Sequence, residues 1–273
     1  MSVTSEYSDG KPAVSFCLLD GGGRVVAERD SGTRYYPAST IKLAVLLAVM
    51  RDIDAGLRSL DDTVVVRRTF TSAQPGADPF TLETDDADER FPDDGTAMQL
   101  RDVLDRMIYR SSNEATNLAL ELIGLDAVND TITDAGLVST KMKRLIGDIA
   151  ARDGGLTNQT TASDLARLMR VIVSGMLTSA GSTRFMITAL EHQDFAYIAP
   201  GLPAGVRWGS KSGWVEGITH DVAFIGTPGT AATLYLAVCT RGYDERQGIE
   251  AVGAMAAGIT TPLLIAAPED FDA

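Results

Sequence analysis

The chain has 273 residues, of which 45% are hydrophobic and 22% are charged, a composition typical of a globular protein with a sizeable core in one or two domains. Its net charge of −13 and pI of about 4.6 argue against nucleic acids and anionic membranes as partners. No apolar run is long enough to span a bilayer, and residues 1–12 lack the apolar segment of a signal peptide. The sequence as given therefore predicts a cytoplasmic protein; removal of a leader would instead indicate a secreted or periplasmic one.

The two cysteines lie in separate apolar runs and are predicted to be free, buried thiols rather than a disulfide. No cluster of cysteine and histidine predicts a metal site, and we expect no cofactor. The oligomeric state is left open.

Strands are predicted first, over residues 13–19 and 24–29, joined by a turn containing three glycines. Residues 41–53 are apolar on nearly every face, which indicates a buried central helix that ends near Gly56. Pro37 prevents a helix from continuing into this segment, and Ser39 or Thr40 is expected to cap it. Further helices are expected over 98–108, 113–123, 126–135, 161–173, 182–190 and 249–265, and further strands over 206–211, 219–226 and 233–240.

Strands at both ends of the chain and helices between them predict an α+β fold. We expect an antiparallel sheet of about five strands drawn from both chain ends, flanked by helices, with an all-helical inserted subdomain. The predicted subdomains are 1–58 together with 195–273, and 59–194, with the active site between them. Residues 71–95 are rich in proline, glycine and acidic residues, and are interpreted as a solvated surface loop.

A serine and a lysine three residues apart stand at the start of the apolar central helix. On a helix, Ser39 and Lys42 are neighbours on one side. A buried lysine loses proton affinity and can act as a base near neutral pH, which a serine hydroxyl needs in order to become a nucleophile. The pair is therefore the candidate reacting centre. Residues 8–11 form a second Ser-x-x-Lys match, in a polar stretch without an apolar helix, and we interpret it as chance.

Two more stretches stand out along the chain. Residues 111–113, Ser-Ser-Asn, interrupt two predicted helices, and residues 211–213, Lys-Ser-Gly, end a predicted strand. Together with Ser39-Thr40-Ile41-Lys42, in this order and spacing, they resemble the Ser-x-x-Lys, Ser-Asp-Asn and Lys-Thr-Gly motifs of class A β-lactamases and penicillin-binding proteins. The flanks Ser111–Leu118 and 158–161 are also similar to that family, and the resemblance covers about residues 13–265.

The resemblance implies a role for each motif residue. It makes Ser39 the acylated nucleophile, Lys42 its proton acceptor, and Ser111 the group that passes a proton to the leaving group. The implied substrate-binding residues and groups are Asn113 for the substrate amide, Lys211 and Ser212 for its carboxylate, Gly213 for close approach of the ligand, and the backbone N–H groups of Ser39 and Trp214 as the oxyanion hole.

One feature of class A β-lactamases is missing. Those enzymes carry a glutamate, in Glu-x-x-x-Asn, that activates the deacylating water, and residues 147–158 contain no glutamate. We therefore expect slow turnover of an acyl-enzyme. Glu216 or His220, close to the end of the strand that bears Lys211, is a possible replacement base. The simpler interpretation is that His220 and Asp221 stabilise a turn.

The function implied by the resemblance is that of a serine hydrolase with an acyl-serine mechanism, acting on a small-molecule or peptide amide; β-lactam antibiotics are the expected substrates, with slow hydrolysis because the glutamate is missing. A D,D-peptidase, amidase, esterase or acyltransferase would use the same chemistry; glutaminases also have a Ser-x-x-Lys nucleophile, but their flanks fit less well. A non-catalytic ligand-binding module on the same fold is the alternative of another class.

Overall fold

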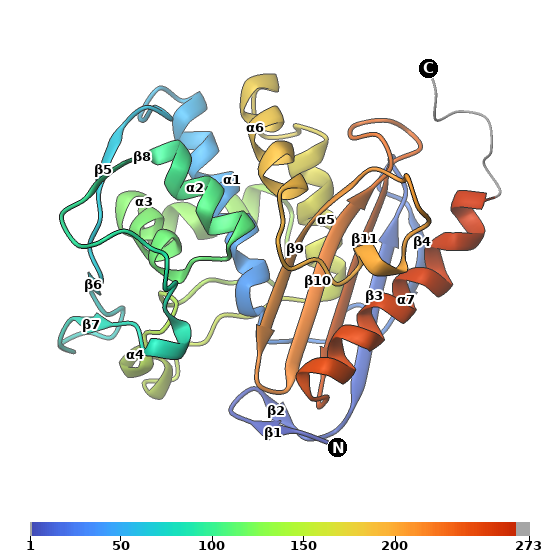
Figure 1. The fold of residues 1–273 in the computed structure, drawn as a ribbon, viewed down its shortest axis with the longest axis horizontal. Helices are drawn as coiled ribbons and strands as arrows, with labels where there is room; N and C mark the ends of the chain where they lie inside the picture. The colour runs from blue at the N-terminus through green and yellow to red at the C-terminus, as the bar shows by residue number, and fades with distance from the viewer. Residues whose placement is uncertain (1, 266–273) are drawn as a thin grey trace.

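The structure, a computed structural model, describes residues 2–265. Its centre is a five-stranded antiparallel sheet in the order β4-β3-β11-β10-β9 (Figure 1). The N-terminal strand β3 pairs with the C-terminal strand β11, which confirms the predicted sheet from both chain ends. The strands are β3 (Ala13–Leu19), β4 (Val25–Arg29), β9 (Trp208–Val215), β10 (Ile218–Ile225) and β11 (Leu234–Arg241).

Helices cover both faces of the sheet. Helix α7 (Glu245–Ile265) packs on β10 and β11 from one side, and α5 (Ala162–Val173) packs on β3, β10 and β11 from the other (Figure 1). The capping signal at the start of α5 is confirmed, because Thr161 Oγ1 accepts the N–H of Asp164 at 3.1 Å. Helix α6 (Ala180–Glu191) packs against α5 and β9. These two helices of the middle segment thus lie directly against the sheet and its edge.

The central helix begins with a 3₁₀ turn, η1 (Ala38–Ile41), which passes directly into α1 (Lys42–Asp54). Residues 42–50 are all buried, as the apolar pattern predicts. The expected side-chain cap is not formed. Thr40 Oγ1 instead donates to the carbonyl of Pro37, and the 3₁₀ turn itself begins the helix.

Helix α2 (Leu100–Tyr109) and helix α3 (Asn113–Asp134) pack against α1 and each other, with the predicted break between them. The predicted stop at Gly124 is also present, as a kink with φ 79° and ψ 158° where two helical segments meet end to end. A short helix not predicted from the sequence, α4 (Ile149–Asp153), follows further along. The subdomain boundaries at 58/59 and 194/195 remain predictions.

The acidic segment 71–95 is a largely exposed surface loop, as interpreted from the sequence, and it also contains short regular elements. It contains β7 (Phe80–Thr81), which pairs with β6 (Thr69–Phe70) just before the segment, and the 3₁₀ turn η2 (Thr84–Asp86). A neighbouring strand pair is β5 (Thr63–Val65) with β8 (Ala97–Gln99). The segment folds back because buried polar groups on α2 and α3 bind it, as described below.

The chain begins with a small hairpin, β1 (Thr4–Ser5) and β2 (Ser8–Asp9), below the sheet at the end where β9 turns into β10 (Figure 1). Ser5 Oγ donates to the carbonyl of Glu216 in that turn. Both cysteines are free and buried, as predicted. Within residues 2–265, no helix combines the length and hydrophobicity needed to cross a membrane.

Candidate active site

Ser39 lies in the 3₁₀ turn at the foot of the central helix. Residues i and i+3 of such a turn eclipse one another, so Ser39 and Lys42 stand on one side of it. The residue before the serine, Ala38, has φ 46°, a left-handed conformation that is unfavourable for a residue with a side chain. Ser111 has φ 56° as well. Backbone strain of this kind is concentrated at functional sites, and here it lies next to Ser39 and at Ser111 itself.

Lys42 is completely buried and points toward the second motif. Its Nζ donates to the carbonyl of Ser111 at 2.6 Å and to Oδ1 of Asn113 at 2.7 Å, and lies 3.3 Å from Ser111 Oγ. Among the described residues, these hydrogen bonds of Lys42 go to the second motif rather than to Ser39. The amine is therefore bound to the second motif, while its residue shares one side of the helix start with Ser39.

Lys211 brings the third motif to the same hydroxyl. Its Nζ donates to Ser111 Oγ at 3.0 Å and to the carbonyl of Ser212 at 2.8 Å. Both lysines therefore contact Ser111 Oγ. This convergence joins α1, the α2–α3 break and β9, three segments that are far apart in the sequence.

Burial lowers the pKa of both amines. Desolvation, with the nearby charge of Lys211 as the second cause, places the pKa of Lys42 well below its ordinary value of 10.5. Desolvation lowers the pKa of Lys211 to about 7, against the opposing effect of Asp221. Lys42 is thereby suited to accept a proton, and Lys211 carries its positive charge over the lower part of the physiological range.

Strand β9 presses against the nucleophile's turn. A side chain at Gly213 would lie 2.8 Å from the backbone nitrogen of Ser39 and 3.0 Å from that of Thr40, so only glycine permits the contact. The next residue, Trp214, pairs with Thr219 of β10 and exposes its side chain at the cavity described below. The close approach supports the prediction that backbone N–H groups of Ser39 and Trp214 face one oxyanion.

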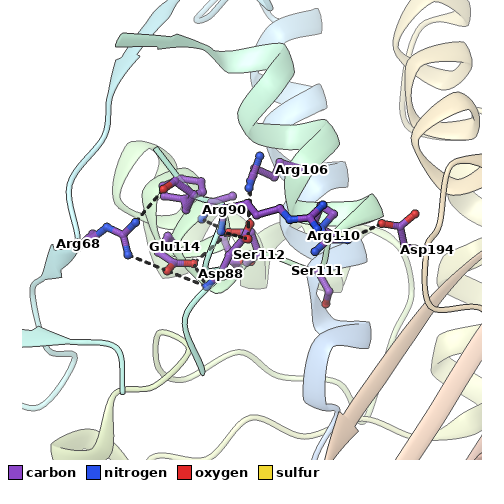
Figure 2. Close-up of polar contacts among 12 residues, drawn as sticks. Arg68, Asp88, Arg90, Arg106, Arg110, Ser111, Ser112, Glu114 and Asp194 are labelled. Carbon is purple, nitrogen blue, oxygen red and sulfur yellow. Dashed lines mark hydrogen bonds and ion pairs between the residues drawn. The ribbon is translucent and has the colours of Figure 1, made fainter. Parts of the chain in front are cut away.

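A buried polar network supports the second motif (Figure 2). Ser112 Oγ caps α3 by accepting the N–H of Ala115 at 3.3 Å, and donates to the carboxylate of Glu114 at 3.1 Å. Glu114 also accepts the backbone N–H of Asp88 at 3.0 Å and lies 3.7 Å from Arg68. The family pattern has an aspartate at the position of Ser112. Here the buried carboxylate comes from Glu114, two residues later.

The same network fixes the acidic segment over the site. Asp88 accepts two hydrogen bonds from Arg106 of α2, at 2.7 and 3.2 Å (Figure 2). Asn113 Nδ2 donates to the carbonyl of Asp86 at 2.8 Å. The sequence does not predict these contacts. Arg106 and Glu114 flank the second motif, but in the sequence they resemble ordinary charged residues on helix surfaces.

A cavity of about 190 Å³ opens beside Ser39. It lies between the nucleophile's turn, the end of β9, the N-terminal hairpin, η2 and the start of α4. Sequence reasoning assigned only three of its lining residues, namely Ser39, Asn113 and Trp214. Its other lining residues are Glu6, Tyr7, Tyr36, Ala38, Glu83, Asp86, Arg144, Ile146, Gly147, Asp148, Ile149, Arg152 and Val215.

The part of the cavity wall that contains Ile146 is held by a side chain of α3. Asn117 Nδ2 donates to the carbonyl of Ile146, and Asn117 Oδ1 accepts the N–H of Ile146, both at 2.9 Å. The position thus locked into the wall carries an aliphatic side chain. Asp148, two residues on, is buried and accepts from Ser72 and from two backbone N–H groups, so its carboxylate is fully engaged.

The two suggested replacement bases are not brought to the cavity. Glu216 is exposed in the β9–β10 turn, where its carbonyl contacts the N-terminal hairpin. His220 is buried with both ring nitrogens in use: Nδ1 accepts the N–H of Thr240 at 3.1 Å, so Nε2 donates to the carbonyl of Tyr36 at 3.0 Å. Burial lowers the pKa of His220 to about 4. Its geometry is that of a structural residue that ties β10 to the segment before Ser39.

Asp221 is also structural in its contacts. Its Oδ2 accepts the backbone N–H groups of Tyr197 and Ile198 at 2.8 and 2.9 Å, rather than contacting His220. Burial raises the pKa of Asp221 to about 6. Across residues 2–265 no group of three histidine, cysteine, aspartate or glutamate side chains is arranged to hold a metal ion.

Comparisons with known proteins agree with this geometry. The profile of the β-lactamase enzyme family matches residues 2–261. The β-lactamase of Sphaerobacter thermophilus is 30% identical with a TM-score of 0.79, and the match covers 93% of each chain. PBP-A is 19% identical with a TM-score of 0.78, covering 93% of this chain and 91% of that one, which shows likeness of fold. An ancestral class A β-lactamase is 24% identical with a TM-score of 0.73, covering 92% and 94%.

A comparison with curated proteins finds no match. The family match nevertheless spans nearly the whole chain, and the structural match to the Sphaerobacter enzyme covers 93% of it. The chain therefore belongs to the β-lactamase enzyme family and is a serine hydrolase that acts on amide bonds.

Proposed function

We propose that Ser39 is acylated by β-lactams and by related small-molecule or peptide amides that carry a carboxylate, and that the acyl group leaves slowly. The observation that carries the proposal is the convergence of Lys42 and Lys211 on Ser111 Oγ, next to the turn of Ser39. Such an arrangement supplies a proton acceptor, a proton relay and a cationic anchor around one nucleophile.

The acylation step follows from these positions. Neutral Lys42 takes the proton of Ser39 Oγ as the oxygen bonds to the substrate carbonyl carbon. The resulting oxyanion accepts hydrogen bonds from the backbone N–H groups of Ser39 and Trp214. When the C–N bond breaks, the leaving nitrogen takes the proton of Ser111 Oγ, and Ser111 regains a proton from Lys42 through their 3.3 Å contact. Protonated Lys211 holds the substrate carboxylate.

Slow deacylation is proposed because hydrolysis needs a base for the attacking water. The wall position locked by Asn117 holds Ile146, and Asp148 has its oxygens engaged by other groups. Besides Glu6, which pairs with Arg152, and Asp148, the carboxylates that line the cavity are Glu83 and Asp86. Both belong to the segment around η2, and they are the groups to test if turnover proves fast.

Intact-protein mass spectrometry over time, after mixing with benzylpenicillin or a cephalosporin, tests the proposal, with Ser39→Ala as the control. We expect an adduct that depends on Ser39 and persists for many minutes. Rapid loss of drug with no lasting adduct would contradict slow deacylation, and Glu83→Gln and Asp86→Asn would then identify the base. Absence of both adduct and drug loss would contradict acylation by β-lactams and favour another amide, an ester or a non-catalytic binding module.

A further inference from the structure

A buried arginine lies in the wall of the Ser39 cavity without an acidic partner. Arg144 is 2% exposed and is the only arginine classed as buried among residues 2–265. Among the described side chains, no carboxylate lies within 4 Å of its guanidinium, whereas the guanidinium of Arg152 on the same wall pairs with Glu6 and Asp153. An unpaired buried charge is strongly unfavourable unless something else compensates it.

The hydrogen bonds of Arg144 leave donors free. A guanidinium has five N–H groups. Nη1 donates to the carbonyl of Leu145 at 3.2 Å, and Nη2 donates to Tyr7 Oη at 2.9 Å and, more weakly, to Tyr36 Oη at 3.4 Å. Nε is buried and has no partner. All three acceptors are neutral, so they orient the guanidinium without neutralising it.

The neutral contacts hold the side chain in a fixed position. The ring of Tyr36 lies 5.5 Å from the guanidinium carbon, and Tyr7 of the N-terminal hairpin stacks on Tyr36 at 3.9 Å. Asn158 Oδ1 accepts the backbone N–H groups of Lys143 and Arg144 from the other side. Because both rings line the cavity, the guanidinium is held at its wall by rigid aromatic groups.

The other charges on the cavity do not compensate Arg144. Asp148 keeps its charge but is held by three neutral donors and forms no described ion pair with Arg144, and Glu6 is paired with Arg152. Glu83 and Asp86 are exposed, so water and salt screen their charges, while the charge of buried Arg144 is screened much less. The cavity therefore offers an anion one strong, fixed partner.

We propose that Arg144 binds a carboxylate on the acyl part of the substrate, so that the enzyme favours substrates with a second anionic group besides the one held at Lys211. The acyl part is indicated because Ser39 and Asn113 line this cavity, whereas Lys211 and Ser212 do not. A charge-assisted hydrogen bond from the second N–H of Nη1 to a carboxylate would use a free donor and compensate the charge. This inference rests on the proposed function, since it assumes that Ser39 receives the acyl group.

Benzylpenicillin and carbenicillin give a matched test, because carbenicillin differs by one added carboxylate on the acyl side chain. Binding of each is measured by calorimetry on the Ser39→Ala protein, which gives an answer whether or not Ser39 reacts. We expect carbenicillin to bind at least about tenfold more tightly, as a hydrogen-bonded charge pair in a buried site allows. In Ser39→Ala with Arg144→Met that preference should vanish while benzylpenicillin binding stays within about twofold, and Arg144→Lys should keep part of it.

Two further variants separate charge and folding effects from anion binding. Arg246→Met removes an exposed arginine of α7 that pairs with Glu250, far from the cavity lining, and should leave the preference intact. Tyr7→Phe removes one acceptor of Arg144 but keeps the guanidinium, and should maintain or increase the preference.

Equal binding of the two penicillins to Ser39→Ala would overturn the inference without any Arg144 variant being needed. Equal weakening of both by Arg144→Met, with a lower melting temperature, would show that Arg144 only holds the N-terminal hairpin, and would also overturn it. Failure of the proposed function would appear separately, as absence of an adduct on unmodified Ser39.

Discussion

Replacing Lys211 by methionine should make folding stability less dependent on pH. Burial lowers the pKa of Lys211 from its ordinary 10.5 to about 7, so the folded chain binds fewer protons than the unfolded chain between these values. The native lysine therefore destabilises the fold by an amount that grows as the pH falls from 10.5 to 7, and is constant below that. At 1.36 kcal/mol per pKa unit, this destabilisation is about 4 kcal/mol at pH 7 and under about 1 kcal/mol at pH 10.

Methionine also removes the hydrogen bonds to Ser111 Oγ and the carbonyl of Ser212, which leaves acceptors unpaired at about 1–3 kcal/mol each. The stability lost with these hydrogen bonds is nearly the same at pH 7 and pH 10. It largely offsets the stability gained at pH 7 by removing the buried ammonium, and at pH 10 it exceeds that gain. Asp221, whose pKa is raised to about 6, stays ionised over this range and does not change the sign. The quantity to measure is therefore the change in the variant's relative stability between the two pH values, about 3 kcal/mol.

Urea unfolding of the native protein and of Lys211→Met at pH 7 and pH 10 measures this change in relative stability. Lys141→Met is the matched control, because Lys141 is exposed and its relative stability should be the same at both pH values. If Lys211→Met has the same relative stability at pH 7 and pH 10, the ammonium is fully compensated in the folded protein and the reasoning is wrong. The same variant should lose acylation by carboxylate-bearing substrates, since the anchor is gone.

Three further outcomes follow from the site. Ile146→Glu places a carboxylate in the cavity wall that Asn117 locks, and should shorten the acyl-enzyme lifetime by about 10²–10⁴-fold as general-base catalysis allows; an equal effect of Ile146→Gln, followed by intact mass, would exclude base catalysis. The rate constant for acylation at low substrate should fall above about pH 7, as Lys211 loses its proton, and should fall again in acid as Lys42 gains one; a profile that keeps rising to pH 9 would contradict the role of protonated Lys211. Glu114→Ala breaks a buried charged network and should lower the free energy of unfolding by about 3–5 kcal/mol in urea titration, whereas an effect no larger than that of an exposed variant would show that the network is dispensable.

The sequence determined the parts of this protein that local chemistry decides. The period of the apolar residues located the central helix and the strands from both chain ends, because burial imposes the repeat of the element that is buried. Ser39, Ser111 and Lys211 could be found because each motif carries its own signature of residue types, and their order along the chain limits the chemistry. The structure brings Ser111 and Lys211 into contact with each other and with Lys42 of the first motif.

The tertiary structure decided which groups stand around the nucleophile. The acidic segment is an exposed loop, as interpreted, but only the structure shows that the buried carboxylate of Glu114 and the side chain of Arg106 bind it over the site. Likewise, Ile146 and Arg144 have no signature of their own, and only the bonds from Asn117 and the contact with Tyr7 place them in the cavity wall. Charge and hydrogen-bonding capacity act over a few ångströms in space, and the sequence alone does not show which residues that distance joins.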